Sequence, residues 1–211
     1  MERVKCRVFA GLAALALAGG ILVAAGPPAG AATQLCGSTC VTLITANYGS
    51  SEAMDVQSLQ VAAGTAVDLG ASGAYLGEDF HLDYVATTTQ LYQDGLVPIE
   101  VAKNWPSYPV YQYIFTPDGY QGYALCLGLA VNAASGTPVT LQSCGVDDHT
   151  LWIPDKARES NGWEPMIAGS DTRATKPYVL QAHNPDGQLT IQELTTGVTP
   201  SQYWQNLTGV L

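Results

Sequence analysis

Residues 54–80 read MDVQSLQVAAGTAVDLGASGAYLGEDF, and 72 positions later residues 126–152 read CLGLAVNAASGTPVTLQSCGVDDHTLW. The two stretches align over 27 residues without a gap, so that a Gly-Thr pair, two aliphatic positions and a closing aromatic residue coincide. A looser third copy at 178–204 ends on the same aromatic position once about two residues are added after Leu194. Internal repetition of this kind predicts a chain built from three similar units.

The hydrophobic period within each copy is two, which is typical of β-strands and not of helices. Short runs rich in β-branched and aromatic residues occupy positions 41–46, 66–69, 111–115, 138–142 and 189–192. Clusters of Gly, Pro, Asn and Asp separate these runs and indicate turns. After residue 32, no stretch combines helix caps with a sustained apolar stripe. The sequence therefore predicts an all-β fold.

Three copies around a pseudo-threefold axis can close a barrel, whereas one copy is too small to bury a sheet face alone. The Gly-Thr-x-Val segment of each copy would form an inner strand. The closing aromatic residues, Phe80, Trp152 and Trp204, would fill the core between the units. Two insertions, at about 85–120 and 155–177, interrupt the period, and the first is expected to carry an added strand at 111–115.

The aromatic residues of the first insertion allow two interpretations. Trp105, Tyr108, Tyr111 and Tyr113 could form an exposed pocket or interface, since aromatic side chains anchor both sugars and protein partners. They could equally pack the extra strand against the side of the barrel. The sequence leaves both interpretations open.

The first 32 residues are typical of a secretory signal peptide. Arg3, Lys5 and Arg7 precede an apolar run at 8–23, and small residues at 29–32 supply a cleavage site. An uncleaved membrane anchor is the alternative, but glycines and prolines break the run before it reaches spanning length. We therefore expect a secreted, extracellular protein with one domain at 33–211, whose repeats cover about 41–84, 120–155 and 165–208.

The charge and length of the exported chain limit which partners and how many domains are expected. Removing residues 1–32 reduces 18 acidic and 8 basic residues to 17 and 5, a net charge of −12. This charge disfavours binding to nucleic acid or to an anionic membrane surface. About 179 residues remain, which suffices for one domain with its own core.

Four cysteines follow the predicted signal peptide: Cys36, Cys40, Cys126 and Cys144. An even number in an exported chain favours disulfides, and four cysteines allow three pairings. A Cys126–Cys144 bridge would close a local loop within one repeat and leave Cys36 to pair with Cys40. Zinc is the disfavoured alternative, because the motif CGSTC has no partner His or Cys at finger-like spacing. We expect no metal and no cofactor.

Each copy contains a Cys-Leu-Asp-Val-like strand, an Asn-Gly-Thr-Pro-Val-like turn and a closing Gln-x-Trp-like motif. The first motif is matched by residues 53–56, 126–129 and 179–182, and the closing motif by 78–80, 150–152 and 202–204. The closing motif is intact only in the last copy. Over most of 41–208 the chain thereby resembles the ricin-type β-trefoil lectin family. The resemblance implies a β-trefoil that binds carbohydrate and does not catalyse a reaction.

Family members hold a sugar with the Asp of the first motif, an aromatic residue near the end of the third strand, and an Asn-Gln pair before the Trp. Here Asp55 is the one Asp retained, since Gly128 and Gln181 stand at the other two positions. The position of the aromatic residue is occupied by Gly70, Gln142 and Gln192, and that of the glutamine by Glu78, Thr150 and Gln202.

The resemblance therefore points to a sugar site in the first repeat. Asp55 and Glu78 would accept hydrogen bonds from sugar hydroxyls, and Tyr75 would stack on the ring. Alternatively, Asp55 begins a strand or caps a turn and Tyr75 lies on the surface. Gln202 is expected to be structural and to hydrogen-bond the backbone beside Trp204.

No sequence motif of a known catalytic mechanism is present, so we expect no catalysis. The chain has no Gly-x-Ser-x-Gly, His-Glu-x-x-His or Gly-rich phosphate loop. His81, His149 and His183 are far apart in sequence, and the adjacent acidic pairs at 78–79 and 147–148 would point to opposite faces of a strand. A small hydrolase using a carboxylate such as Glu78 is the least favoured interpretation.

The sequence thus predicts a secreted, monomeric, carbohydrate-binding protein with a glycan as its partner. The alternative is a β-trefoil that has lost sugar binding and acts on a secreted protein partner. In that role it would be an interaction module or an inhibitor of a secreted hydrolase, and would present residues 98–115 of the first insertion.

Overall fold

The computed structural model describes residues 40–56, 61–73, 76–116, 124–145, 147–173 and 175–208. The predicted signal peptide, Cys36 and Tyr75 lie outside these residues. The chain divides into two compact units, 1–30 and 31–211, and every described residue belongs to the second. None of the helices in the described part of the chain is long and apolar enough to cross a membrane.

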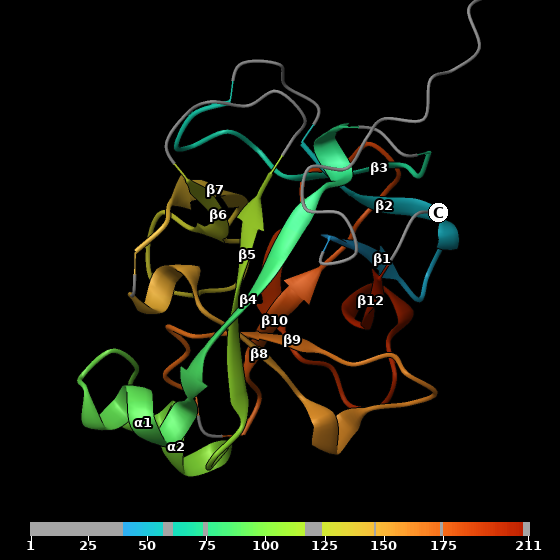
Figure 1. Cartoon of the computed structure of the whole chain (residues 1–211). Helices are drawn as coiled ribbons and strands as arrows, with labels where there is room; N and C mark the ends of the chain where they lie inside the picture. The colour runs from blue at the N-terminus through green and yellow to red at the C-terminus, as the bar shows by residue number, and fades with distance from the viewer. Residues whose placement is uncertain are drawn as a thin grey trace, which may run out of the picture. The chain divides into compact units, whose positions relative to one another are not determined.

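Twelve β-strands belong to one sheet within the described residues, four in each repeat (Figure 1). The first repeat contains β1 (Cys40–Thr45), β2 (Gly49–Asp55), β3 (Asp68–Ala71) and β4 (Phe80–Thr87). The second contains β5 (Pro109–Phe115), β6 (Leu125–Leu129), β7 (Val139–Ser143) and β8 (Trp152–Pro154). The third contains β9 (Met166–Ala168), β10 (Tyr178–Gln181), β11 (Thr190–Glu193) and β12 (Trp204–Thr208).

Short 3-10 turns stand at corresponding places in the three repeats. The turns η2 (Leu76–Glu78), η3 (Asp148–Thr150) and η5 (Pro200–Gln202) each precede the last strand of their repeat. A further turn, η4 (Lys156–Arg158), lies in the connection between β8 and β9. The predicted all-β class is confirmed, and the correspondence of strands and turns shows that the three copies adopt the same structure.

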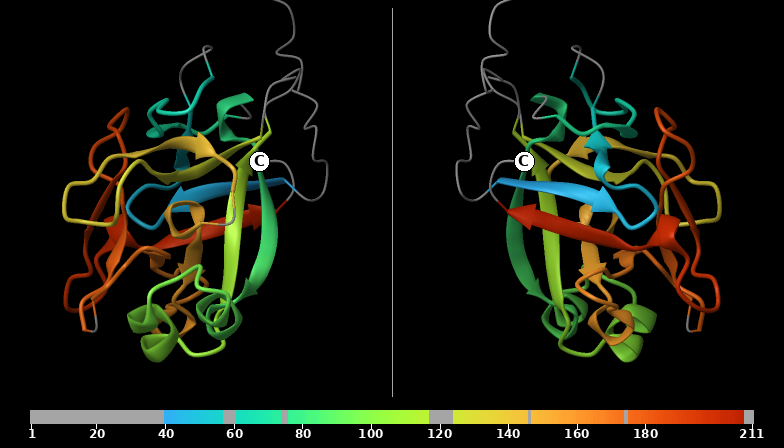
Figure 2. Two further views of the ribbon diagram at one scale, coloured as in Figure 1. Left: turned by 90° about the vertical axis from the view of Figure 1, so that its left-hand side faces the viewer. Right: turned by 90° about the vertical axis from the view of Figure 1, so that its right-hand side faces the viewer.

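The first and last strands of the three repeats form a closed barrel. β1 pairs with β12 and β4, β5 pairs with β4 and β8, and β8 pairs with β9, all antiparallel (Figure 2). A bridge between Glu164 and Trp204 joins the segment before β9 to β12 and completes the ring. Closure leaves none of these barrel strands with an unpaired edge.

The other strands form three hairpins that meet at one end of the barrel. Their backbones are joined by a cycle of hydrogen bonds in which the amide of Val67 donates to the carbonyl of Val139 (3.2 Å), Val139 to Leu189 (2.9 Å) and Leu189 to Val67 (2.9 Å). All three side chains are fully buried. These aliphatic residues occupy the same position in each repeat. The cycle of hydrogen bonds between them therefore relates the three repeats by an approximate threefold axis.

The strand register corrects the gap-free alignment by one residue at the start of the repeat. Met54 lies opposite Leu69 on β3, and Leu127 lies opposite Leu141 on β7. Met54 therefore corresponds to Leu127, an offset of 73, while β3 and β7 keep the offset of 72. The reason is a connection between β2 and β3 that is one residue longer than its equivalent in the second repeat. The match of residues 53–56 to 126–129 has the correct register.

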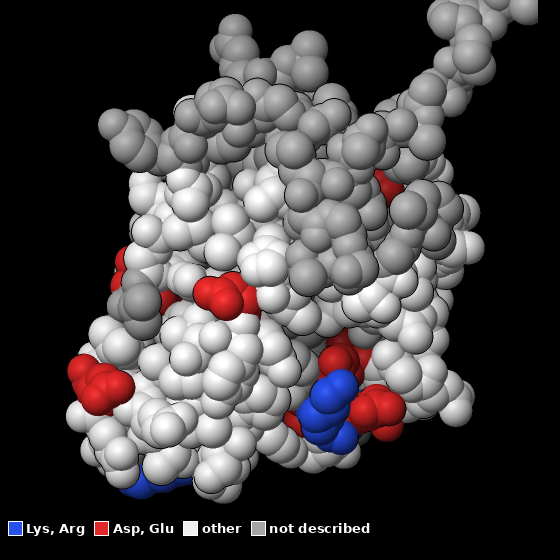
Figure 3. All heavy atoms as spheres, viewed as in Figure 1, with Lys and Arg blue, Asp and Glu red and all other residues white. Residues whose placement is uncertain are grey.

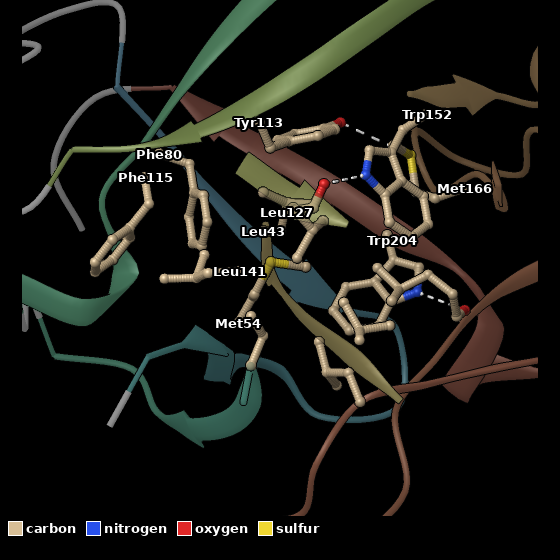
Figure 4. Packing of buried hydrophobic residues seen from close by; sticks show 14 of the residues in the cluster. Leu43, Met54, Phe80, Tyr113, Phe115, Leu127, Leu141, Trp152, Met166 and Trp204 are labelled. Atoms are coloured by element: carbon tan, nitrogen blue, oxygen red, sulfur yellow. Dashed lines mark hydrogen bonds between the residues drawn. The ribbon is translucent and has the colours of Figure 1, made fainter. Parts of the chain in front are cut away.

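The closing aromatic residues are buried in the main core. Phe80 and Trp152 are 0% exposed and Trp204 is 1% exposed, and all three belong to one hydrophobic cluster. The indole of Trp152 donates to the carbonyl of Leu127 (2.9 Å), and that of Trp204 donates to the carbonyl of Leu180 (3.0 Å) (Figure 4). Phe80 has no such donor and contacts Phe115 instead, with the ring centroids 5.5 Å apart.

The first insertion contains two short helices that the hydrophobic pattern did not predict. Helices α1 (Thr88–Gln93) and α2 (Ile99–Asn104) follow β4 (Figure 1). Thr87 and Gln90 form a reciprocal capping box at the start of α1. Each helix has only six residues, too few for its apolar positions to form a stripe. Its buried face packs with barrel residues in a second hydrophobic cluster containing Leu91, Val101 and Ile153.

The strand expected as an addition at 111–115 is the first strand of the second repeat. As β5 it pairs with β4, β6 and β8, so it belongs to the repeat and not to the insertion. Trp105 is 4% exposed and Tyr113 is 0% exposed, and for these two residues the packing interpretation is correct. Tyr108 and Tyr111 are partly buried and pack against the two hydrophobic clusters, and Tyr111 also meets the 53% exposed Tyr84 edge to face.

The predicted Cys126–Cys144 disulfide is confirmed, and it ties β6 to the residue that follows β7, with 5.0 Å between the two Cα atoms. Cys40 is also disulfide-bonded. Its predicted partner Cys36 lies outside the described residues, so that pairing stays a prediction.

Candidate functional site

Asp55 ends β2 at the outer end of the first hairpin, opposite Asp68 of β3. Its carboxylate occupies space that two glycines leave free. A Cβ on Gly70 would lie 2.8 Å from Oδ2, and a Cβ on Gly77 would overlap Oδ1. Neither glycine can gain a side chain without moving the carboxylate, so the Asp55 side chain depends on glycine at both positions. We call this arrangement the Asp55 notch.

The carboxylate in the Asp55 notch has no cationic partner among the described residues. Burial raises the pKa of Asp55, the backbone amide of Val56 lowers it, and nearby Asp68 raises it further. The pKa of Asp68 is also raised by its own burial and by the negative charge of Asp186. Asp55 remains half-buried, so its exposed lone pairs can accept hydrogen bonds from a ligand.

Glu78 lies in η2 but is only 2% exposed, and its Oε1 accepts a hydrogen bond from the backbone amide of Gly73 (3.0 Å). The corresponding residues act in the same way. Thr150 donates to the carbonyl of Gly145 (2.9 Å), and Gln202 accepts from the amide of Thr195 (3.0 Å). Glu78 therefore tethers the loop after β3, and its carboxylate is not presented at the surface as the sugar-site prediction requires.

The equivalents of the Asp55 notch in the other two repeats offer no free carboxylate. Gly128 replaces the Asp in the second repeat, and a Cβ there would lie 3.0 Å from the carbonyl oxygen of His149 and 3.1 Å from the Gln142 side chain. In the third repeat, Gln181 accepts a hydrogen bond from Gln202 (2.9 Å). Among the described residues, an Asp at this position of the repeat thus occurs in the first repeat alone.

Of the three predicted sugar-binding residues, the structure places Asp55 in the half-exposed Asp55 notch and buries Glu78 against the loop after β3. Tyr75 lies outside the described residues, so its role as a stacking ring stays a prediction. Nothing in the sequence indicated that Gly77 leaves room for Asp55. Gly70 was interpreted only as the replacement of the stacking aromatic residue. Gln202 has the expected structural role, because its side chain also donates to the carbonyl of Glu193 (2.9 Å).

A second group of polar side chains lies at η3, where ligand atoms of Asp147, Asp148 and His149 fall within 4.8 Å of one another. Local contacts account for this grouping. Asp147 caps the turn by accepting from the amide of His149 (3.1 Å), and the imidazole Nε2 of His149 contacts the Asn132 amide oxygen (2.8 Å). The grouping follows from three consecutive residues in one turn, and no more distant His, Cys, Asp or Glu joins it among the described residues.

Comparison with known proteins shows the fold. No protein-family model matches the chain, and no curated protein matches its sequence. The designed 3-fold symmetric protein ThreeFoil is structurally similar, with a TM-score of 0.54 and 15% identity over 80% of this chain and 98% of ThreeFoil. A mosquitocidal holotoxin gives a TM-score of 0.55 and 13% identity over 81% of this chain but only 17% of the toxin. The predicted β-trefoil fold is confirmed.

Proposed function

We propose that this protein is a secreted, non-catalytic β-trefoil that binds carbohydrate at the Asp55 notch of its first repeat. The observation that carries the proposal is the carboxylate of Asp55, which occupies the space left by two glycines, is half-exposed and has no cationic partner among the described residues. The β-trefoil fold is consistent with this function.

The chemistry of the notch suits a sugar diol. A carboxylate can accept hydrogen bonds from two adjacent hydroxyl groups, and charge-assisted bonds of this kind are stronger than neutral ones. The backbone amide of Val56 already hydrogen-bonds the carboxylate, which reduces the side-chain freedom that is lost when a ligand binds. Binding is expected to weaken as the pH falls through the raised pKa of Asp55, since a protonated carboxyl group accepts hydrogen bonds less well.

A protein-interaction module is the second candidate function. It is supported by the loss of the acidic residue in the second and third repeats and by exposed aromatic side chains near the helical insertion. Tyr84 on β4 is 53% exposed and Tyr92 on α1 is 41% exposed. Such a surface could contact a secreted protein partner.

A glycan array separates the two functions. We expect the mature wild-type protein to bind at least one class of neutral glycan and Asp55→Asn to lose that binding while retaining its thermal unfolding temperature. Asp83→Asn, a matched change at an exposed position on β4, should bind as the wild type does. Equal binding by Asp55→Asn and the wild type, or no binding to any glycan, would contradict the proposal. Capture of a specific secreted protein together with a silent array would favour the second function.

A further inference from the structure

A pocket of about 370 Å³ lies beside the third repeat and shares no lining residue with the Asp55 notch. Its wall comes from three segments that are distant in sequence: η4, the residues just before β10, and the loop at 194–198 after β11. Tyr203 closes one side. We call it the third-repeat pocket. Its volume lies within the range of small-molecule sites, which is roughly 300–1,000 Å³.

Positive charge is concentrated around this pocket in a chain whose net charge is −10. After residue 32 the sequence has five Lys and Arg residues, and four of them lie at 156–158 and 173–176. Arg158 and Lys176 line the pocket itself. On the face shown in Figure 3, cationic side chains gather over the η4 region with acidic side chains beside them. These basic residues are ion-paired with Asp155, Glu159, Glu164 and Glu193, so any preference for an anion must come from donors that the ion pairs leave free.

Each of the two basic side chains that line the pocket forms an ion pair with a carboxylate and has further N–H donors that this ion pair does not use. Arg158 pairs through Nη1 with Asp155, whose side chain is fully buried, and Lys176 pairs through Nζ with Glu193 Oε1 at 2.9 Å. A guanidinium has five N–H donors and an ammonium has three. The side chains of Arg158 and Lys176 are 41% and 54% exposed, so their remaining donors can reach a ligand.

The rest of the pocket combines apolar surface with hydroxyl groups. Leu194 and Tyr203 form a nearly buried wall, and Val198 is exposed at the rim. Thr175 and Thr196 also line the pocket and carry hydroxyl groups, whereas the hydroxyl of Thr195 is bonded to Gln202 and Thr199. Burial raises the pKa of Tyr203, so its phenol stays protonated and can donate a hydrogen bond.

We propose that the third-repeat pocket binds a carboxylate-bearing sugar, of which a uronic acid is the simplest example. The carboxylate would pair with Arg158 and Lys176. The hydroxyl groups would bond to Thr175 and Thr196, and the less polar ring face would pack against Val198. The choice of an anionic group rests on the spare, exposed donors of Arg158 and Lys176, and the choice of a saccharide rests on the proposed function.

Calorimetric titration of the mature protein with glucuronic acid, glucose and acetate tests this site. We expect glucuronic acid to bind at least about tenfold more tightly than either glucose, which lacks the carboxylate, or acetate, which lacks the sugar ring. Lys176→Gln and Arg158→Gln should each weaken glucuronic acid binding on the order of tenfold. Lys103→Gln on α2, a lysine outside the pocket, is the matched control and should leave the affinity unchanged.

Arg158→Gln leaves the buried Asp155 without its cation and could unfold the protein, so the exposed Lys176→Gln variant decides the test. Equal affinity for glucose and glucuronic acid, equal affinity for acetate and glucuronic acid, or an unchanged affinity in Lys176→Gln would overturn the proposal. Asp55→Asn distinguishes the two sites, because it should abolish neutral-glycan binding and leave glucuronic acid binding intact. If the neutral-glycan arm fails while Lys176→Gln still weakens glucuronic acid binding, only the Asp55 notch is refuted.

Discussion

Replacement of Asp171 by asparagine should change how the stability of the protein depends on pH. Asp171 lies in the loop between β9 and β10, its side chain is fully buried, and its Oδ1 accepts a hydrogen bond from the amide of Arg173 (3.0 Å). Burial raises the pKa of this carboxyl from 3.8 to about 6, against the lowering effect of backbone amides and of the Arg173 charge. The ionised form is therefore less favourable in the folded protein than in the unfolded chain.

The sign and size of the effect follow from proton linkage. Because the folded pKa exceeds the unfolded value, the stability associated with the protonated form is complete below about pH 4 and is lost as the pH rises through about 6. A shift of about two pKa units corresponds to about 3 kcal/mol. Solvent near this surface loop lowers the expected effect to about 2 kcal/mol. Asparagine stays neutral and should not show this loss.

Urea unfolding of the wild type and Asp171→Asn between pH 4 and pH 8 measures the effect. The difference in unfolding free energy should move by about 2 kcal/mol in favour of the variant as the pH rises. This change with pH is informative even if the substitution alters stability at every pH. Asp83→Asn, at an exposed position, is the control. Parallel curves for Asp171→Asn and the wild type, or a difference that moves in favour of the wild type, would refute the reasoning.

Three further predictions concern the notch, the disulfide and the core. Gly77→Ala should displace the Asp55 carboxylate, abolish neutral-glycan binding and lower the unfolding free energy by about 1–3 kcal/mol. In the control Gly145→Ala, the nearest atom to an added Cβ is 3.7 Å away, so glycan binding and stability should stay unchanged. Equal array signals for the two variants would contradict this prediction. Replacing both Cys126 and Cys144 by alanine should lower the unfolding free energy by about 3 kcal/mol, because the disulfide closes a local loop with a sequence separation of 18. An unchanged midpoint of urea unfolding would count against this prediction. Trp204→Phe leaves the carbonyl of Leu180 without its donor and should cost about 1–3 kcal/mol in thermal unfolding, whereas a neutral effect would show that this hydrogen bond contributes little.

The repeat pattern predicted the fold because its decisive residues are buried at equivalent positions. Val67 and Val139 align in sequence and are joined by the backbone hydrogen bond that links their hairpins. The two helices were missed because each has only six residues, although the capping box of Thr87 and Gln90 was a readable signal. β5 was interpreted as an addition because the helical insertion separates it from the end of β4.

The candidate sites were less predictable than the fold. Glu78 was expected at the surface because sequence does not show whether a carboxylate faces solvent or a loop amide. Gly70 was interpreted as the loss of a stacking residue, whereas in the structure its missing side chain makes room for Asp55. The third-repeat pocket brings together Arg158, Lys176 and Tyr203, which are far apart in sequence. Only Tyr203 lies in a repeated motif, and there it is the variable residue between Gln202 and Trp204.

Two-dimensional NMR of the isotopically labelled protein, titrated with a neutral glycan selected on the array, tests the central claim most directly. If the Asp55 notch binds the sugar, the largest amide shifts will occur at Val56, Gly70 and Gly77, and they will disappear in Asp55→Asn. Shifts confined to the equivalent positions around Gly128 and Gln181, or shifts that persist unchanged in Asp55→Asn, would show that the sugar binds elsewhere and that the account of the first repeat is wrong.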